Sequence, residues 1–124
     1  MTRWLSVLFR LLQHPLASRQ RRLVGERAWL TEDRFVSHFP NSSDIASEVW
    51  RSLQREAVVE NFRVAPSDDL FEVFGMADDD VEELVLELLG RFDCRVPAPS
   101  ETKQMPEVRT ASDVVGFVAE MRDQ

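Results

Sequence analysis

The order of apolar and polar residues along the chain predicts α-helices and no convincing pair of β-strands. In three segments, residues 44–61, 78–93 and 113–122, apolar residues recur every three or four positions, the spacing of one helix face. The valine-rich runs are brief and fall within this spacing. We therefore expect an all-α fold in which these side chains point inward: Ile45, Val49, Leu53, Ala57, Val81, Leu84, Val85, Leu88, Val114, Val115, Val118 and Met121.

Polar residues and prolines indicate where the helices begin and end. Thr31 is expected to cap a short helix over residues 32–39, which must stop before Pro40. Residues 62–69 read as a loop, and the proline-broken residues 95–107 as a connection with at most one helical turn. The remaining cap candidates are Ser42 or Ser43 before residues 44–61, and Thr110 or Ser112 before residues 113–122.

The N-terminal part reads as a helical extension, residues 1–42, placed before a bundle formed by residues 43–124. Residues 1–14 are the most apolar stretch, which Arg10 interrupts and Pro15 ends, so the stretch is too short to cross a bilayer. We expect it to pack on its own domain or on a second copy. The alternatives are a helix lying on a membrane surface and a signal peptide. The basic residues 18–30 are also predicted to be helical.

Charge is distributed unevenly along the chain. Residues 1–40 hold seven arginines against three acidic residues, whereas residues 65–124 hold fifteen acidic and five basic residues, within a net charge of −7. Phosphates would be repelled by the acidic half, which argues against nucleic-acid binding there and favours a partner with a basic surface. The single cysteine, Cys94, cannot form an internal disulfide, so we expect a cytoplasmic protein.

From residue 43 onward the chain resembles the acyl carrier proteins. The resemblance lies in the order of its parts: DIASEVWRSL, a long loop, DDLFEVFGM, EELVLELLGRFDCRVP, a short broken segment and TASDVVGFV. The run ELV…L…FD…VP is typical of that family. The resemblance implies a four-helix bundle whose acidic second helix docks against basic protein surfaces.

The residue that carries the cofactor in that family is absent here. The family attaches a phosphopantetheine arm to the serine of a Gly-x-Asp-Ser-Leu motif, and aligning Gly75 with its glycine places Asp78 on the serine. A carboxylate cannot form the phosphate ester, and Ser67 lies in the preceding loop. The chain is similar in this respect to small bacterial acyl-carrier-like proteins with Asp-Asp here. We therefore expect no cofactor.

Carboxylates crowd the start and the solvent side of the helix predicted at residues 78–93. Those nearest the start can accept hydrogen bonds from free backbone N–H groups and oppose the helix dipole. The full set extends further and costs some stability through repulsion, which favours docking against arginines or lysines over an idle solvated face. A calcium loop is disfavoured because the turn glycine and the distal glutamate are missing. The predicted partner-binding residues are Asp78, Asp79, Asp80, Glu82, Glu83 and Glu87.

The other candidates for chemistry have simpler structural interpretations. His14 and His38 lack partners at catalytic or metal-ligand spacing, Cys94 follows a helix in an acidic neighbourhood, and Trp29 and Trp50 are expected to fill the core. No catalytic or metal site is predicted. We expect a non-catalytic adaptor or regulator. The alternatives are a small acidic immunity or inhibitor protein covering a basic toxin or enzyme, and a genuine acyl carrier using an unconventional serine.

Overall fold

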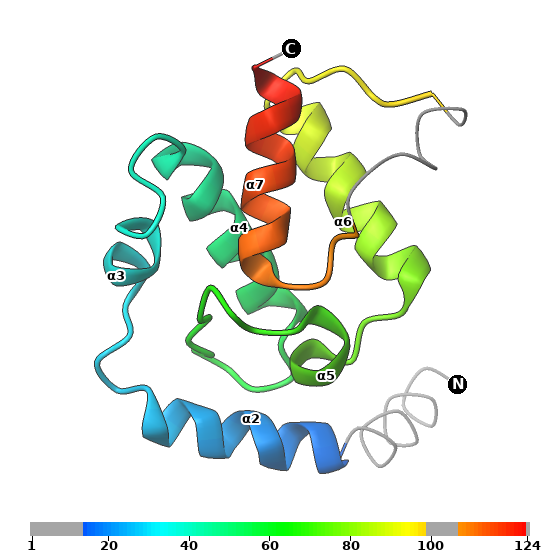
Figure 1. Ribbon diagram of the computed structural model, residues 1–124. Helices are drawn as coiled ribbons and strands as arrows, with labels where there is room; N and C mark the ends of the chain where they lie inside the picture. Colours follow the sequence, from blue (N-terminus) through cyan, green and yellow to red (C-terminus); the bar gives the residue numbers. More distant parts are fainter. Residues whose placement is uncertain (1–13, 99–106, 124) are drawn as a thin grey trace.

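The chain is all-helical where its structure is described. A computed structural model describes residues 14–98 and 107–123, in which six helices and no strand occur (Figure 1). This confirms the all-α prediction. The helix predicted within residues 1–14 lies almost wholly outside the described residues, as does much of the predicted connection at 95–107. The helices are α2 (His14–Glu26), α3 (Glu32–Val36), α4 (Ser43–Glu56), α5 (Leu70–Phe74), α6 (Asp78–Arg91) and α7 (Ala111–Arg122).

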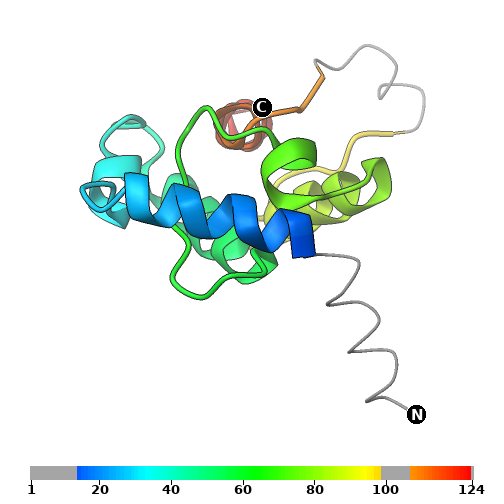
Figure 2. The same ribbon diagram turned by 90° about the horizontal axis from the view of Figure 1, so that it is seen from below.

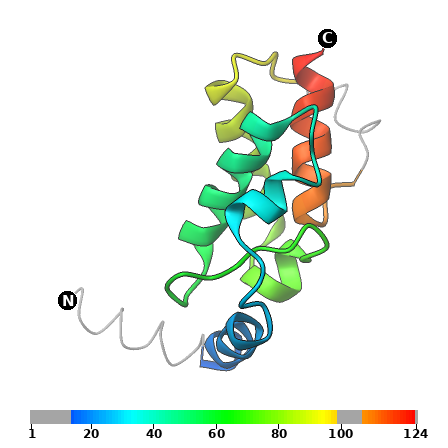
Figure 3. The ribbon, with the colours of Figure 1, turned by 90° about the vertical axis from the view of Figure 1, so that its left-hand side faces the viewer.

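Three helices, α4, α6 and α7, lie side by side and enclose most of the core (Figures 1 and 3). Helix α3 packs on α4, and α2 lies across the end of the bundle where it contacts α5 (Figures 1 and 2). None of the described helices combines the length and apolar character needed to cross a membrane. The buried side chains of α4, α6 and α7 include Ile45, Val49, Leu53, Val81, Leu84, Leu88, Leu89, Val114, Val115, Val118 and Met121.

The predicted inward faces are confirmed, with two positions at their edges. Ala57 and Val85 are half-buried, whereas the other ten predicted side chains are buried. Thr31 and Thr110 are the caps: their side chains accept hydrogen bonds from the backbone N–H groups of Arg34 and Asp113, respectively. Ser42 precedes α4, but its side chain makes no capping hydrogen bond.

Helix α4 is shorter than predicted, ending at Glu56 rather than continuing to residue 61. Ala57 is extended (φ −65°, ψ 142°), which directs the chain away from the helix axis. The N–H groups of Val58 and Val59 then donate to Oε1 of Gln20, at 2.9 and 3.2 Å, in place of helical carbonyls. A side chain of α2 therefore takes up the backbone groups that would have extended α4.

Helix α2 is fixed to the bundle by buried polar contacts. Gln20 is 0% exposed, and its Nε2 also donates to the carbonyl oxygen of Val73 at 2.9 Å, so one side chain joins α2, α5 and the loop after α4. Arg27, just past the end of α2, donates to both carboxylate oxygens of Asp68, a side chain that is nearly buried. Residues of the predicted extension thus pack on the rest of the chain.

Trp29 is not part of the core, contrary to the sequence prediction. Its side chain is 62% exposed, whereas Trp50 is buried as predicted. The cause is the turn that follows α2, in which the N–H of Leu30 donates to the carbonyl of Arg27. This turn directs Leu30 inward at 2% exposure and leaves the indole of Trp29 in solvent.

A short helix, α5, forms in the segment that the sequence indicated only as acidic and apolar. The carboxylate of Asp69 accepts from the N–H groups of Phe71 and Glu72, which starts the helix. The bond from Glu72 contributes most to lowering the pKa of Asp69, with further contributions from Phe71 and the guanidinium of Arg109, while desolvation opposes them. Gly75 ends the helix in the left-handed conformation, at φ 67°.

Candidate interaction site on helix α6

The first turn of α6 begins at Asp78. Ala77 precedes it in an extended conformation and is the N-cap residue. Asp80 Oδ2 accepts a hydrogen bond from the N–H of Ala77 at 2.9 Å, which satisfies one of the backbone donors exposed at the helix start. The three aspartates also lie where the helix dipole favours negative charge. Asp80 is thus partly explained by local helix stability.

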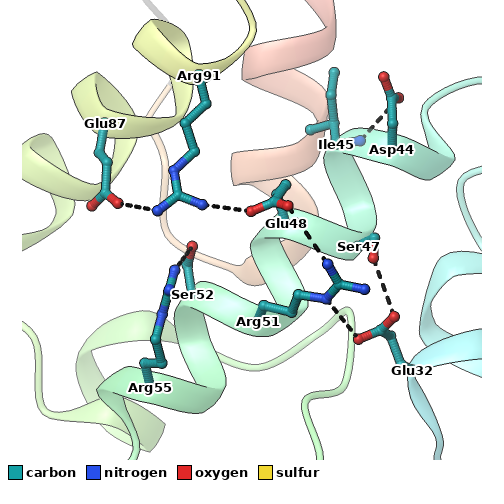
Figure 4. A network of polar contacts seen from close by, with 10 residues as sticks. All are labelled: Glu32, Asp44, Ile45, Ser47, Glu48, Arg51, Ser52, Arg55, Glu87 and Arg91. Atoms are coloured by element: carbon teal, nitrogen blue, oxygen red, sulfur yellow. Dashed lines mark hydrogen bonds and ion pairs between the residues drawn. The ribbon is translucent and has the colours of Figure 1, made fainter.

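Glu87 has partners within the chain. Arg91, one turn further along α6, donates to Glu87 at 2.8 Å and to Glu48 of α4 at 2.7 Å (Figure 4). The contacts continue from Glu48 to Arg51 and from Arg51 to Glu32, so they connect α6, α4 and α3. Exposed ion pairs of this kind contribute little stability individually, but they occupy the carboxylate of Glu87.

The other four predicted carboxylates point to solvent. Asp78, Asp79, Glu82 and Glu83 are exposed, and within residues 14–98 and 107–123 no side chain pairs with them. The six predicted residues therefore all lie on α6 and all are exposed, but they divide into two with intramolecular roles and four that are free to meet another molecule.

An exposed leucine lies among these carboxylates and was missed by the sequence interpretation. Leu86 is 42% exposed, on the side of α6 opposite the core. Gly90 follows one turn later, also exposed, with open space where a Cβ would lie. The signal was available in the helical spacing, which places residue 86 among the polar positions. We call Asp79, Glu82, Glu83, Leu86 and Gly90 the α6 stripe.

The described residues form no candidate metal site. Among them, no group of three His, Cys, Asp or Glu side chains is placed to hold a metal ion. Ser67 is exposed in the loop before α5, so a short helix separates it from the start of α6. At the first position of α6 the chain presents carboxylate oxygens, which suit ion pairing rather than esterification by a phosphate.

The remaining candidates lie apart from α6 or inside the bundle. His38 is exposed, with its Nδ1 2.9 Å from the carbonyl oxygen of Arg34. Cys94 is half-buried and packs against the core. The side chain of His14 lies outside the described residues.

Comparison of the chain with models of protein families, with curated proteins and with solved structures found no match.

Proposed function

We propose that this chain is an acyl-carrier-like helical bundle without the attachment serine, acting as a non-catalytic interaction module in the cytoplasm. In this proposal, α6 docks against a basic surface of a partner protein, and the chain serves as an adaptor or regulator. The observation that carries the proposal is the α6 stripe, where an exposed leucine is surrounded by carboxylates with no described intramolecular partner.

The order of the helices supports the acyl-carrier-like part. From residue 43 onward, α4 is the first helix. A long loop, the short helix α5, the acidic helix α6 and a final helix, α7, follow it, and α7 packs on both α4 and α6. Asp78 occupies the first residue of α6, where the resemblance places the attachment serine. With a carboxylate there, the same surface would retain recognition without carrying cargo.

The exposure of the stripe supports the docking part. Like charges at i,i+3 and i,i+4 spacing destabilise a helix by a few tenths of a kcal/mol per pair, which offsets part of what the helix dipole gains from Asp79. Glu82 and Glu83 lie beyond the first turn, where the dipole favours negative charge less. A partially exposed Leu86 adds apolar surface that water solvates poorly. When the carboxylates of the stripe meet positive charges on a partner, charge complementarity makes the binding selective, and the leucine adds a small apolar contact.

Charge reversal on the stripe tests the proposal. The variant Asp79→Lys, Glu82→Lys and Glu83→Lys should lose at least tenfold in affinity for its partner, because three attractive contacts become repulsive. The measurement is capture by the tagged full chain from the native cell, with mass-spectrometric identification, followed by binding of the purified partner. Glu87 is left unchanged because it pairs with Arg91.

A matched control carries the same charge change elsewhere. Glu26, Glu60 and Glu120 are exposed on α2, on the turn after α4 and on α7, and their replacement by lysine should leave capture intact. Equal loss in both variants, or capture unchanged by reversal of the stripe, would contradict docking through α6. Separately, a mass increase on incubation with a phosphopantetheinyl transferase would contradict the absence of an attachment site.

A further inference from the structure

A cleft of about 550 Å³ lies between α2 and α5. Its apolar lining is formed by Leu23 and Val73, both half-buried, and its charged lining is mainly positive. We call this depression the α2–α5 cleft. Its lining residues are Arg19, Arg22, Leu23, Arg27, Glu72 and Val73.

Two of its three arginines are held in place by the fold. Arg19 Nη1 donates to the carbonyl oxygen of Glu72 at 2.9 Å, which fixes the guanidinium across the cleft while leaving its other N–H groups available. Arg27 is fixed by Asp68, which also neutralises it. Arg22 lies one turn from Arg19, is exposed, and has no side-chain partner in the described part of the chain. With Arg27 paired to Asp68, the cleft presents Arg19 and Arg22 against the single carboxylate of Glu72, beside an apolar surface.

The α6 stripe has the complementary features. Leu86 is the protruding apolar side chain, and Glu82 and Glu83, one turn before it on either side, supply negative charge. The stripe offers an apolar projection between carboxylates, and the cleft offers an apolar depression beside guanidiniums.

We propose that the α2–α5 cleft of one copy of this chain binds the α6 stripe of a second copy. Leu86 of the second copy contacts Leu23 and Val73, while its Glu82 and Glu83 pair with Arg19 and Arg22. The charge complementarity of two surfaces on the same molecule favours a second copy over an unrelated acidic ligand.

The contact joins two different surfaces, so it has a defined consequence for assembly. In a pair, one copy retains an unused stripe and the other retains an unused cleft, and heterologous contacts of this kind extend into chains or close into rings. A stripe that is occupied by another copy is covered. Self-association therefore competes with the partner docking proposed above, and it is carried by a site, the α2–α5 cleft, that docking does not use.

Two variants separate the surfaces. The cleft variant is Arg19→Glu with Arg22→Glu, and the stripe variant is Glu82→Gln, Glu83→Gln and Leu86→Gln. In analytical ultracentrifugation at low salt, the average mass of the unmodified chain should rise with concentration to at least twice the single-chain mass. It should fall again at 1 M salt, where the screening length is about 3 Å. Circular dichroism checks that both variants keep their helicity.

The decisive measurement is a mixture. Each variant alone should remain a single chain, whereas an equimolar mixture should form a one-to-one pair, because one variant retains the stripe and the other retains the cleft. The cleft variant should still capture the partner of α6, so the two proposals fail separately. An unmodified chain that stays single at every concentration would overturn the inference. So would association that persists in the cleft variant, or a mixture that does not pair.

Discussion

Two glycines show how a single residue depends on its surroundings. Gly75 has φ 67° where α5 ends, and a Cβ there would lie 2.9 Å from Cδ2 of Leu16. Gly116 lies in the middle of α7, is exposed, and has open space where its Cβ would lie. The first glycine is required by the backbone conformation, whereas the second weakens a helix that would accept alanine.

The same substitution at these two positions should therefore have opposite effects. Gly75→Ala should lower the free energy of unfolding by about 1–2 kcal/mol, the cost of placing an L-residue in the left-handed region. Gly116→Ala should raise it by about 0.5–1 kcal/mol, because alanine loses less backbone entropy in a helix. Urea denaturation of both variants measures the difference, and a stabilising change at Gly75 would contradict the described turn.

Helix α6 presents two leucines of similar sequence context to opposite environments. Leu84 is 5% exposed and belongs to the hydrophobic core, whereas Leu86, two residues later, is 42% exposed. A substitution at Leu84 therefore tests the core of the fold, and a substitution at Leu86 tests the exposed surface of the same helix.

Truncating the two leucines should change the free energy of unfolding by very different amounts. Leu84→Ala should lower the free energy of unfolding by about 2–5 kcal/mol, the usual cost of a buried cavity. Leu86→Ala should change it by no more than about 0.5 kcal/mol, as at other surface positions. Thermal and urea unfolding provide the measurement. Equal losses at the two positions would show that Leu86 is covered.

Helix faces could be predicted from the regular spacing of apolar residues within each segment. Features that depend on contacts between residues far apart in the chain could not be predicted. The faces of α4, α6 and α7 follow from apolar spacing within each segment, and Thr31 and Thr110 from local cap chemistry. The early end of α4 depends on Gln20, a residue 38 positions away from Val58. Likewise, the sequence placed all six carboxylates on one helix. It could not show that Arg91 binds Glu87 together with Glu48, which lies 43 positions earlier.

Across the whole molecule, ion pairs join segments that are far apart in the chain. Arg122 near the end of α7 donates to Asp44 near the start of α4 at 2.6 Å, a separation of 78 positions. This hydrogen bond, aided by the N–H of Ile45, holds the pKa of Asp44 below its ordinary value, while desolvation opposes it. Asp44 is largely exposed, so solvent screens much of the effect.

Acid should remove the contribution of this pair. Because the pKa of Asp44 is lower in the folded chain, the unfolded chain binds more protons as the pH falls, and folding stability decreases. The contribution is fully present above the ordinary pKa of 3.8 and is lost as the pH falls through the folded value. Asp44→Asn should therefore differ from the unmodified chain at pH 6 and converge with it in acid. The control Glu120→Gln, at an exposed position of α7, should have the same free energy of unfolding in urea as the unmodified chain both at pH 6 and in acid.

The anchoring of α2 by Gln20 has a consequence for synthesis. The carbonyl of Val73 that receives its amide lies 53 positions later in the chain, and the two N–H groups that donate to it lie 38 and 39 positions later. At about 5–20 residues per second, translation needs roughly 3–10 seconds to supply the last of these groups. Helix α2 therefore leaves the ribosome before the groups that bind Gln20 have been synthesised. Until then, its apolar side chains, including Ala17 and Val24, remain in contact with water. We therefore expect α2 to pack on the bundle late in folding, although it is synthesised early.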